Sequence, residues 1–142
     1  MNFPRELHLC LTSFVRAIHR HGFGIQSPSD YELVRDVLFE KLHYYAYNDL
    51  NLQTEGERQL WRIRNHFGEV VVIETKGEEA TKQYEQAMQS KKPVIVIEET
   101  DDENATLWNI AMTDERATIT FDMGKRGLIV VNDKRIKQNY IL

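Results

Sequence analysis

Three glutamates follow two runs of β-branched residues and are the clearest candidates for chemistry in this sequence. Glu74 follows the run at residues 70–73, and Glu98 and Glu99 follow the run at residues 94–97. Because the carboxyl ends of neighbouring parallel strands meet at one edge of a sheet, these side chains can converge there. Carboxylate oxygens are ligands that Mg²⁺ and Ca²⁺ prefer. The glutamates therefore allow a divalent-metal or small-molecule site. The alternative is a solvated acidic loop, since acids stabilise a first helical turn without any metal.

A glycine-rich segment, residues 20–28, is the second candidate. It contains His21, Gly22, Gly24 and Ser27. Imidazole titrates near neutral pH, so His21 can act as a general base or orient a substrate. The alternative is a connector between two helices, in which the glycines adopt positive φ and Ser27 caps the next helix.

Composition narrows the class of protein. The chain has 142 residues, a net charge of −4 and a single cysteine, which leaves no disulfide framework and no zinc ligand set. Its apolar runs are far shorter than the roughly 20 residues of a membrane span, and its N-terminus lacks a signal-peptide pattern. The acidic balance, with no aromatic residues interleaved among the basic ones, argues against nucleic-acid binding. We expect a cytoplasmic protein that contacts neither membrane nor nucleic acid.

The first half of the chain has helical periodicity. Apolar residues recur at helical spacing between Pro4 and Ile18, and Ser27 and Pro28 open a second helix whose buried side runs to Leu42. A third helix is expected from Leu60 to a stop at Gly68. Residues 1–67 are therefore predicted to form a helical N-terminal segment.

The second half has the pattern of an α/β sheet. The runs at residues 70–73 and 94–97 flank a helical stretch at 78–89, which predicts two parallel strands joined by a helix. A short helix around Trp108 follows, and then strands at 117–121 and 128–131 form an antiparallel hairpin about the turn 124–127. Residues 138–142 can add a last strand. We expect one domain, 1–142, in which residues 68–142 form the sheet.

Two stretches resemble a group of bacterial class I S-adenosylmethionine-dependent methyltransferases. Residues 20–28, Arg-His-Gly-Phe-Gly-Ile-Gln-Ser-Pro, are similar to the loop that joins two helices ahead of their catalytic domain, although Ser29 stands where they usually carry an aromatic residue. From Val70 onward the chain resembles their fourth and fifth strands, the helix between these, and the closing hairpin. The resemblance implies a truncated Rossmann-like sheet with strands in the order four, five, seven, six of the parent fold, the last pair antiparallel.

The cofactor-binding half of that fold is missing from this sequence. A complete sheet with its helices needs about 170 residues, and only the part after Gly68 remains for it here. Strands one to three of the parent fold would carry the glycine-rich turn and the acid that holds the ribose. A different alignment makes residues 70–73 the first strand and 74–77 a decayed cofactor loop, but Lys76 and Glu78 are bulky where glycines are needed.

The sequence therefore predicts no catalytic residue and no cofactor, and a non-catalytic methyltransferase relic that acts as an interaction or assembly module. One alternative is an active methyltransferase whose S-adenosylmethionine site is divergent or supplied by a partner. A second is a protein that binds a small molecule or a divalent metal at the acidic strand ends.

Loss of the parent's first strand leaves an unpaired edge on the strand formed by Val70, Val71, Val72 and Ile73. This run contains no proline, lysine or glycine to deter pairing. The N-terminal helices can cover the edge, or two chains can pair there across a two-fold axis. We expect the homodimer, because a helix cannot satisfy a whole backbone ladder. An unknown protein partner is a further possibility.

Overall fold

A computed structural model describes residues 15–17, 19–20 and 24–142 of the chain. The chain divides into two compact units, Met1–Gly68 and Glu69–Leu142. The predicted first helix lies mostly outside the described residues, and the part of it at residues 15–17 is helical. His21 and Gly22 also lie outside the described residues.

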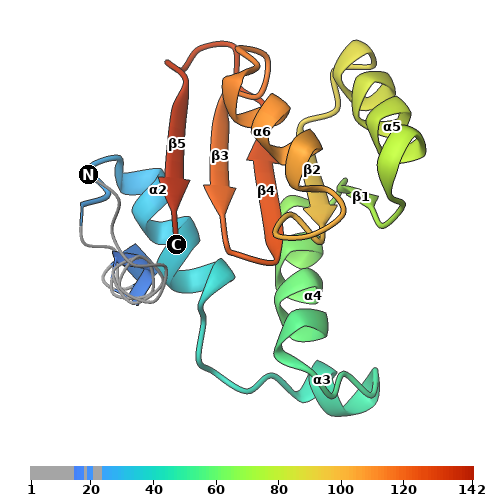
Figure 1. Ribbon diagram of the computed structural model, residues 1–142. Coiled ribbons are helices and arrows are strands. Elements are labelled where there is room, and N and C mark those ends of the chain that lie inside the picture. Colours follow the sequence, from blue (N-terminus) through green and yellow to red (C-terminus); the bar gives the residue numbers. More distant parts are fainter. Residues whose placement is uncertain (1–14, 18, 21–23) are drawn as a thin grey trace, which may run out of the picture. The chain divides into compact units, whose positions relative to one another are not determined.

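The first unit is helical in its described part (Figure 1). Helix α2, Pro28–Leu33, continues into a π-helix, η1, Val34–Leu38. Ser27 holds the predicted N-cap position, but its hydroxyl makes no capping bond and lies 3.2 Å from the hydroxyl of Ser29. The prediction that Leu42 is buried is wrong: it is 65% exposed, because the helix ends at Leu38.

Two further helices complete this unit. Helix α3, Tyr45–Asp49, is a short helix that lies in the sequence between the second and third helices expected above. Helix α4, Glu55–Phe67, begins earlier than predicted because Thr54 and Glu57 form a capping box, in which each side chain accepts the other's backbone N–H. It ends at Gly68 as predicted, with the glycine at a φ of +79°.

The second unit is an α/β fold with a five-stranded mixed sheet, as the sequence predicts at the level of fold class. Its elements are β1 (Val71–Ile73), α5 (Gly77–Gln89), β2 (Val94–Glu98), α6 (Ala105–Thr113), β3 (Ile119–Asp122), β4 (Arg126–Val130) and β5 (Gln138–Ile141). The strand order is β1-β2-β4-β3-β5. Strands β1 and β2 are parallel, β4 is antiparallel to β2 and β3, and β5 is parallel to β3. The first four strands thus take the predicted order.

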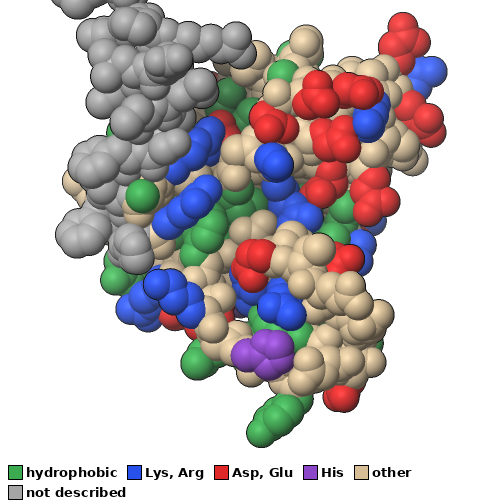
Figure 2. All heavy atoms as spheres, turned by 60° about the horizontal axis from the view of Figure 1, so that its bottom comes forward, with side chains coloured by type: hydrophobic (Ala, Val, Ile, Leu, Met, Phe, Trp, Pro, Cys, Tyr) green, Lys and Arg blue, Asp and Glu red, His purple; other side chains and the backbone are tan. Residues whose placement is uncertain are grey.

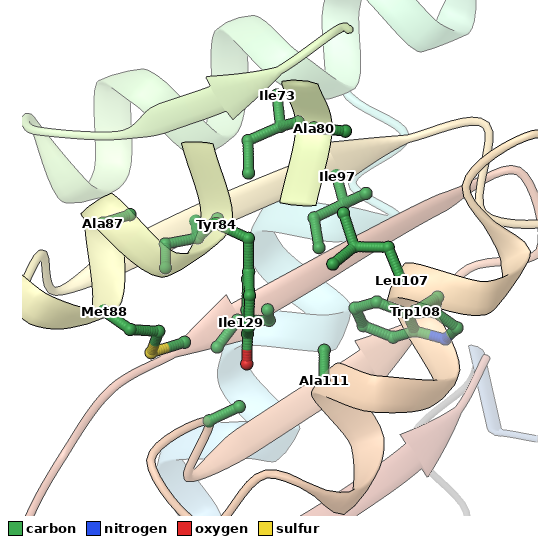
Figure 3. Packing of buried hydrophobic residues seen from close by; sticks show 12 residues of the cluster. Ile73, Ala80, Tyr84, Ala87, Met88, Ile97, Leu107, Trp108, Ala111 and Ile129 are labelled. Atoms are coloured by element: carbon green, nitrogen blue, oxygen red, sulfur yellow. The ribbon is translucent and has the colours of Figure 1, made fainter. Parts of the chain in front are cut away.

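The core of this unit lies between the sheet and the two helices α5 and α6 (Figure 3). Tyr84 of α5 and Trp108 of α6 are its largest side chains, and both are buried. Every residue from Val94 to Ile97 is also buried, so both faces of β2 are covered, as its continuous β-branched run predicts. The cluster comprises Ile73, Ala80, Tyr84, Ala87, Met88, Ile95, Ile97, Leu107, Trp108, Ala111, Ala117 and Ile129.

The predicted limits of the hairpin need correction. Arg126 and Gly127 belong to β4, where Gly127 lies opposite Ile97 of β2, and not to the turn.

Within the described residues, no helix is long and apolar enough to cross a membrane.

Candidate functional site

The carboxyl ends of β1 and β2 are fixed by one buried side chain, Asn104, just before α6. Its amide nitrogen donates to the carbonyl of Thr75, at 2.8 Å, and to the carbonyl of Glu98, at 3.0 Å. Asn104 is only 1% exposed. The loops that follow the two parallel strands are therefore held together, as the sequence predicts for acidic residues at one edge of the sheet.

Glu98 is engaged in an ion pair across strands and does not present a free carboxylate. It lies opposite Arg126 of β4 in the sheet register. The guanidinium donates to both carboxylate oxygens, with an Nη2–Oε2 distance of 3.0 Å. Because both side chains are largely buried, this pair is a structural link between β2 and β4.

The acidic cluster that the described part of the chain brings together is Glu99, Asp102 and Glu103, whose carboxylate oxygens lie within 4.8 Å of one another. Of the three glutamates singled out from the sequence, only Glu99 belongs to it. The ammonium of Lys76 lies 2.9 Å from Glu99 Oε2 and 3.3 Å from Glu103 Oε1. These two hydrogen bonds raise the pKa of Lys76. A divalent cation would have to displace this ammonium from the exposed cluster.

Of the glycine-rich loop, the structure describes Gly24 and Ser27. Gly24 has a φ of +81°, the left-handed conformation that glycine adopts without strain. Ser27 is the N-cap residue of α2. The φ of Gly24 fits the connector interpretation, but the capping bond that this interpretation expects from the hydroxyl of Ser27 is not formed. A chemical role for His21 stays a prediction.

The candidate interface strand forms one edge of the sheet. Strand β1 pairs with β2 on one side, and within the described residues no strand pairs with its other side. Ile73 is buried and Val71 packs on the core cluster, whereas Val70 and Val72 are half-buried. The edge expected from the sequence is therefore present, formed by residues 71–73 and flanked by Glu69 and Glu74.

A polar site in the first unit was missed by the sequence prediction. Arg62 of α4 has a side chain only 4% exposed, and its guanidinium donates to the carbonyls of Val37 and Leu38, at 2.6 and 3.0 Å. It also donates to the hydroxyl of Tyr47 and to Glu55. Arg62 thereby caps the end of η1, where helix carbonyls lack intrahelical partners. One sequence feature could have indicated this site: an arginine that lies next to Ile63, on the side of α4 that helical spacing predicts to be buried.

Beside Arg62 lies a cavity of about 790 Å³. It is bordered by the residues that follow η1, by Tyr47 of α3 and by one face of α4. The lining combines aromatic rings with an excess of basic side chains. These lining residues are Arg20, Arg35, Asp36, Phe39, Glu40, Lys41, Leu42, His43, Tyr47, Glu55, Arg58 and Arg62.

Comparison of the chain with family models, with curated proteins and with solved structures found no match.

Proposed function

We propose that this chain is a non-catalytic relic of a class I S-adenosylmethionine-dependent methyltransferase, and that it works as a homodimeric assembly module in the cytoplasm. The observation that carries the proposal is the edge strand β1, which pairs with β2 alone among the described strands. Unpaired N–H and C=O groups along such an edge favour the addition of another strand.

The composition of β1 supports pairing. Natural edge strands are usually protected by lysine, proline, a bulge or inward-pointing charge. Residues 70–73 contain none of these, and residues 71–73 form a parallel ladder with β2 in a regular register. A second copy of the same apolar strand is a suitable partner because its residues can pack against their own counterparts across a two-fold axis.

Symmetry restricts how two β1 strands can pair. In an antiparallel ladder, residues directly opposite each other point their side chains to the same face of the sheet, whereas neighbouring residues of one strand point to opposite faces. A two-fold axis must therefore pass midway between one residue and its own copy. Val71 and Val72 are the central candidates. A register centred between them would place Glu69 opposite Glu74 of the other copy, but symmetry forbids it. Either permitted register joins two five-stranded sheets into one.

The relic interpretation is supported by the strand order and by the loop after β1. Four strands follow the order that the resemblance implies. Gly77 is the first residue of α5 and has a φ of +65°, but no other glycine accompanies it between β1 and that helix. Lys76 beside it is bound to Glu99. This loop therefore lacks the series of glycines that lets a backbone approach a cofactor.

Two proline variants test the dimer. Neighbouring residues of a strand point their N–H groups to opposite sides, so Val71→Pro and Val72→Pro remove one amide that faces β2 and one that faces outward. The variant that loses the β2-facing amide should have the lower melting temperature. The other should keep its melting temperature and sediment as a monomer. Monomeric wild-type protein at tens of micromolar would refute the homodimer.

Calorimetry with S-adenosylmethionine tests the relic interpretation separately. We expect no saturable binding to the isolated protein, because the turn and the acid that the cofactor needs are missing from the sequence. A dissociation constant below about 50 µM, equivalent to about 6 kcal/mol, would instead favour an active methyltransferase with a divergent site. Binding that appears only after a second protein is added would favour a site supplied by a partner.

A further inference from the structure

The cavity beside Arg62 has a local charge opposite to that of the chain. The whole protein carries a net charge of −4. Figure 2 shows that side chains of both charge signs lie on the face in view. The cavity lining contains five Lys and Arg residues and three carboxylates.

The carboxylates of the cavity are already engaged. The carboxylate of Asp36 accepts two hydrogen bonds from the guanidinium of the neighbouring Arg35, at 2.7 and 3.0 Å. Glu55 accepts from Arg62 at 2.6 Å. Glu40 accepts the backbone N–H groups of Lys41 and Leu42, at 2.8 and 3.0 Å. Each acid of the lining therefore has a partner within its own segment or on α4.

Three cations of the lining form no ion pair with any residue that the structure describes: Arg20, Lys41 and Arg58. Arg58 donates from Nε to the carbonyl of Leu52, at 3.0 Å, and its guanidinium lies over the ring of Tyr47, 5.3 Å from the centroid. Arg20 lies over the ring of Phe39, 5.0 Å from the centroid. Burial and the nearby charge of Arg16 lower the pKa of Arg20.

An aromatic ring lies against the face of each guanidinium, and the Nε of Arg58 is bound to a carbonyl. The terminal nitrogens of both guanidiniums remain available as donors. An arginine fork matches phosphate oxygens in this arrangement. The three cations carry three positive charges. Glu40 is bound only by backbone N–H groups, so its negative charge has no cationic partner. The site therefore has an excess of two positive charges. This excess equals the charge of a phosphate monoester near neutral pH.

We propose that this cavity binds a phosphate-bearing small molecule, held by Arg20, Lys41 and Arg58. Arg62 is a positioning residue for the site. Its hydrogen bonds join the end of η1, the hydroxyl of Tyr47 and the carboxylate of Glu55 in one network. Tyr47 in turn supports the guanidinium of Arg58. A volume of about 790 Å³ accommodates a nucleotide-sized ligand. This site is independent of the β1 edge.

Calorimetric titration of the full chain with inorganic pyrophosphate, AMP and citrate tests the proposal. We expect saturable binding of pyrophosphate or AMP. The tighter of the two identifies the ligand as an inorganic phosphate or a phosphate ester. Citrate should bind more weakly than both, since a tricarboxylate lacks the tetrahedral oxyanion. Tighter binding of citrate, or no saturation by either phosphate below about 5 mM, would overturn the proposal.

Matched variants locate the site. Arg58→Gln should raise the dissociation constant about tenfold, whereas Arg64→Gln, an exposed arginine of the same helix outside the cavity, should change it less than about twofold. Lys41→Gln should also weaken binding. Its side chain is exposed, so this variant keeps the test valid if Arg58→Gln lowers stability. Equal losses for Arg58→Gln and Arg64→Gln would show non-specific attraction and contradict the site.

Discussion

Trp108 of α6 lies directly against the backbone of Gly127 in β4. A Cβ atom at position 127 would come within 2.3 Å of Cζ3 of the indole and within 2.5 Å of two further ring atoms. The glycine is therefore required by the close approach of a helix to the sheet. It does not serve the hairpin turn, to which the sequence had assigned it.

The first prediction follows from this contact. Gly127→Ala should lower the free energy of unfolding by about 2–3 kcal/mol, because the methyl group must displace a buried aromatic ring in a close-packed core. Urea denaturation measures the change. Combining it with Trp108→Leu, which makes room for the methyl group, should cost less than the sum of the two single changes. Strict additivity would show that the indole does not oppose the alanine.

The second prediction concerns the cap of the π-helix. Arg62→Leu should lower the free energy of unfolding by about 2 kcal/mol, since it leaves the buried carbonyl of Val37 without its side-chain donor and the carbonyl of Leu38 with only the amide of Gln59. Arg64→Leu, on the exposed side of the same helix, should change it by no more than about 0.5 kcal/mol. Similar effects of both variants would contradict the role of Arg62. Thermal unfolding followed by far-ultraviolet circular dichroism measures the change.

The third prediction is a pH dependence at Asp114. Its carboxylate accepts hydrogen bonds from Arg116 and from the hydroxyl of Tyr84, and these lower its pKa to about 2. The side chain is 13% exposed. A carboxyl whose pKa is lower in the folded state stabilises the protein above its unfolded pKa of 3.8, and this contribution is lost as the pH falls toward 2.

Asp114→Asn should therefore be less stable than the wild type by about 2 kcal/mol at pH 7, and the difference should shrink between pH 4 and pH 2. Denaturant titrations of both proteins across this range measure it. A constant difference at every pH would mean that the charge of Asp114 contributes nothing.

The fourth prediction concerns the acidic cluster. Millimolar Mg²⁺ or Ca²⁺ should not raise the melting temperature of the wild type, because the ammonium of Lys76 already binds both Glu99 and Glu103 and offsets part of their charge. Differential scanning fluorimetry with and without chelator provides the measurement. A stabilisation by Ca²⁺ that disappears in Glu103→Gln would instead support the metal-binding alternative.

The parts of the fold that were predicted from the sequence depend on local patterns. The continuous β-branched run of β2 indicated a strand covered on both faces, and Gly68 indicated the end of α4. Features that depend on distant contacts were missed. Gly127 is explained only by Trp108, and the exposure of Leu42 follows from the early end of η1. The cavity joins side chains from Arg20 to Arg62, and no spacing within the sequence indicates that they meet.

Disulfide trapping tests the pairing of β1 with its own copy most directly. In a background of Cys10→Ser, Val71→Cys and Val72→Cys place a thiol at each of the two central positions. A residue that faces its own copy in an antiparallel ladder has a Cα–Cα distance of about 4.5–5.5 Å, which a disulfide can span. We predict that mild oxidation converts one of the two variants to a covalent dimer, while Asn109→Cys, on the exposed side of α6, stays monomeric. Equal, low cross-linking of all three variants would contradict the account.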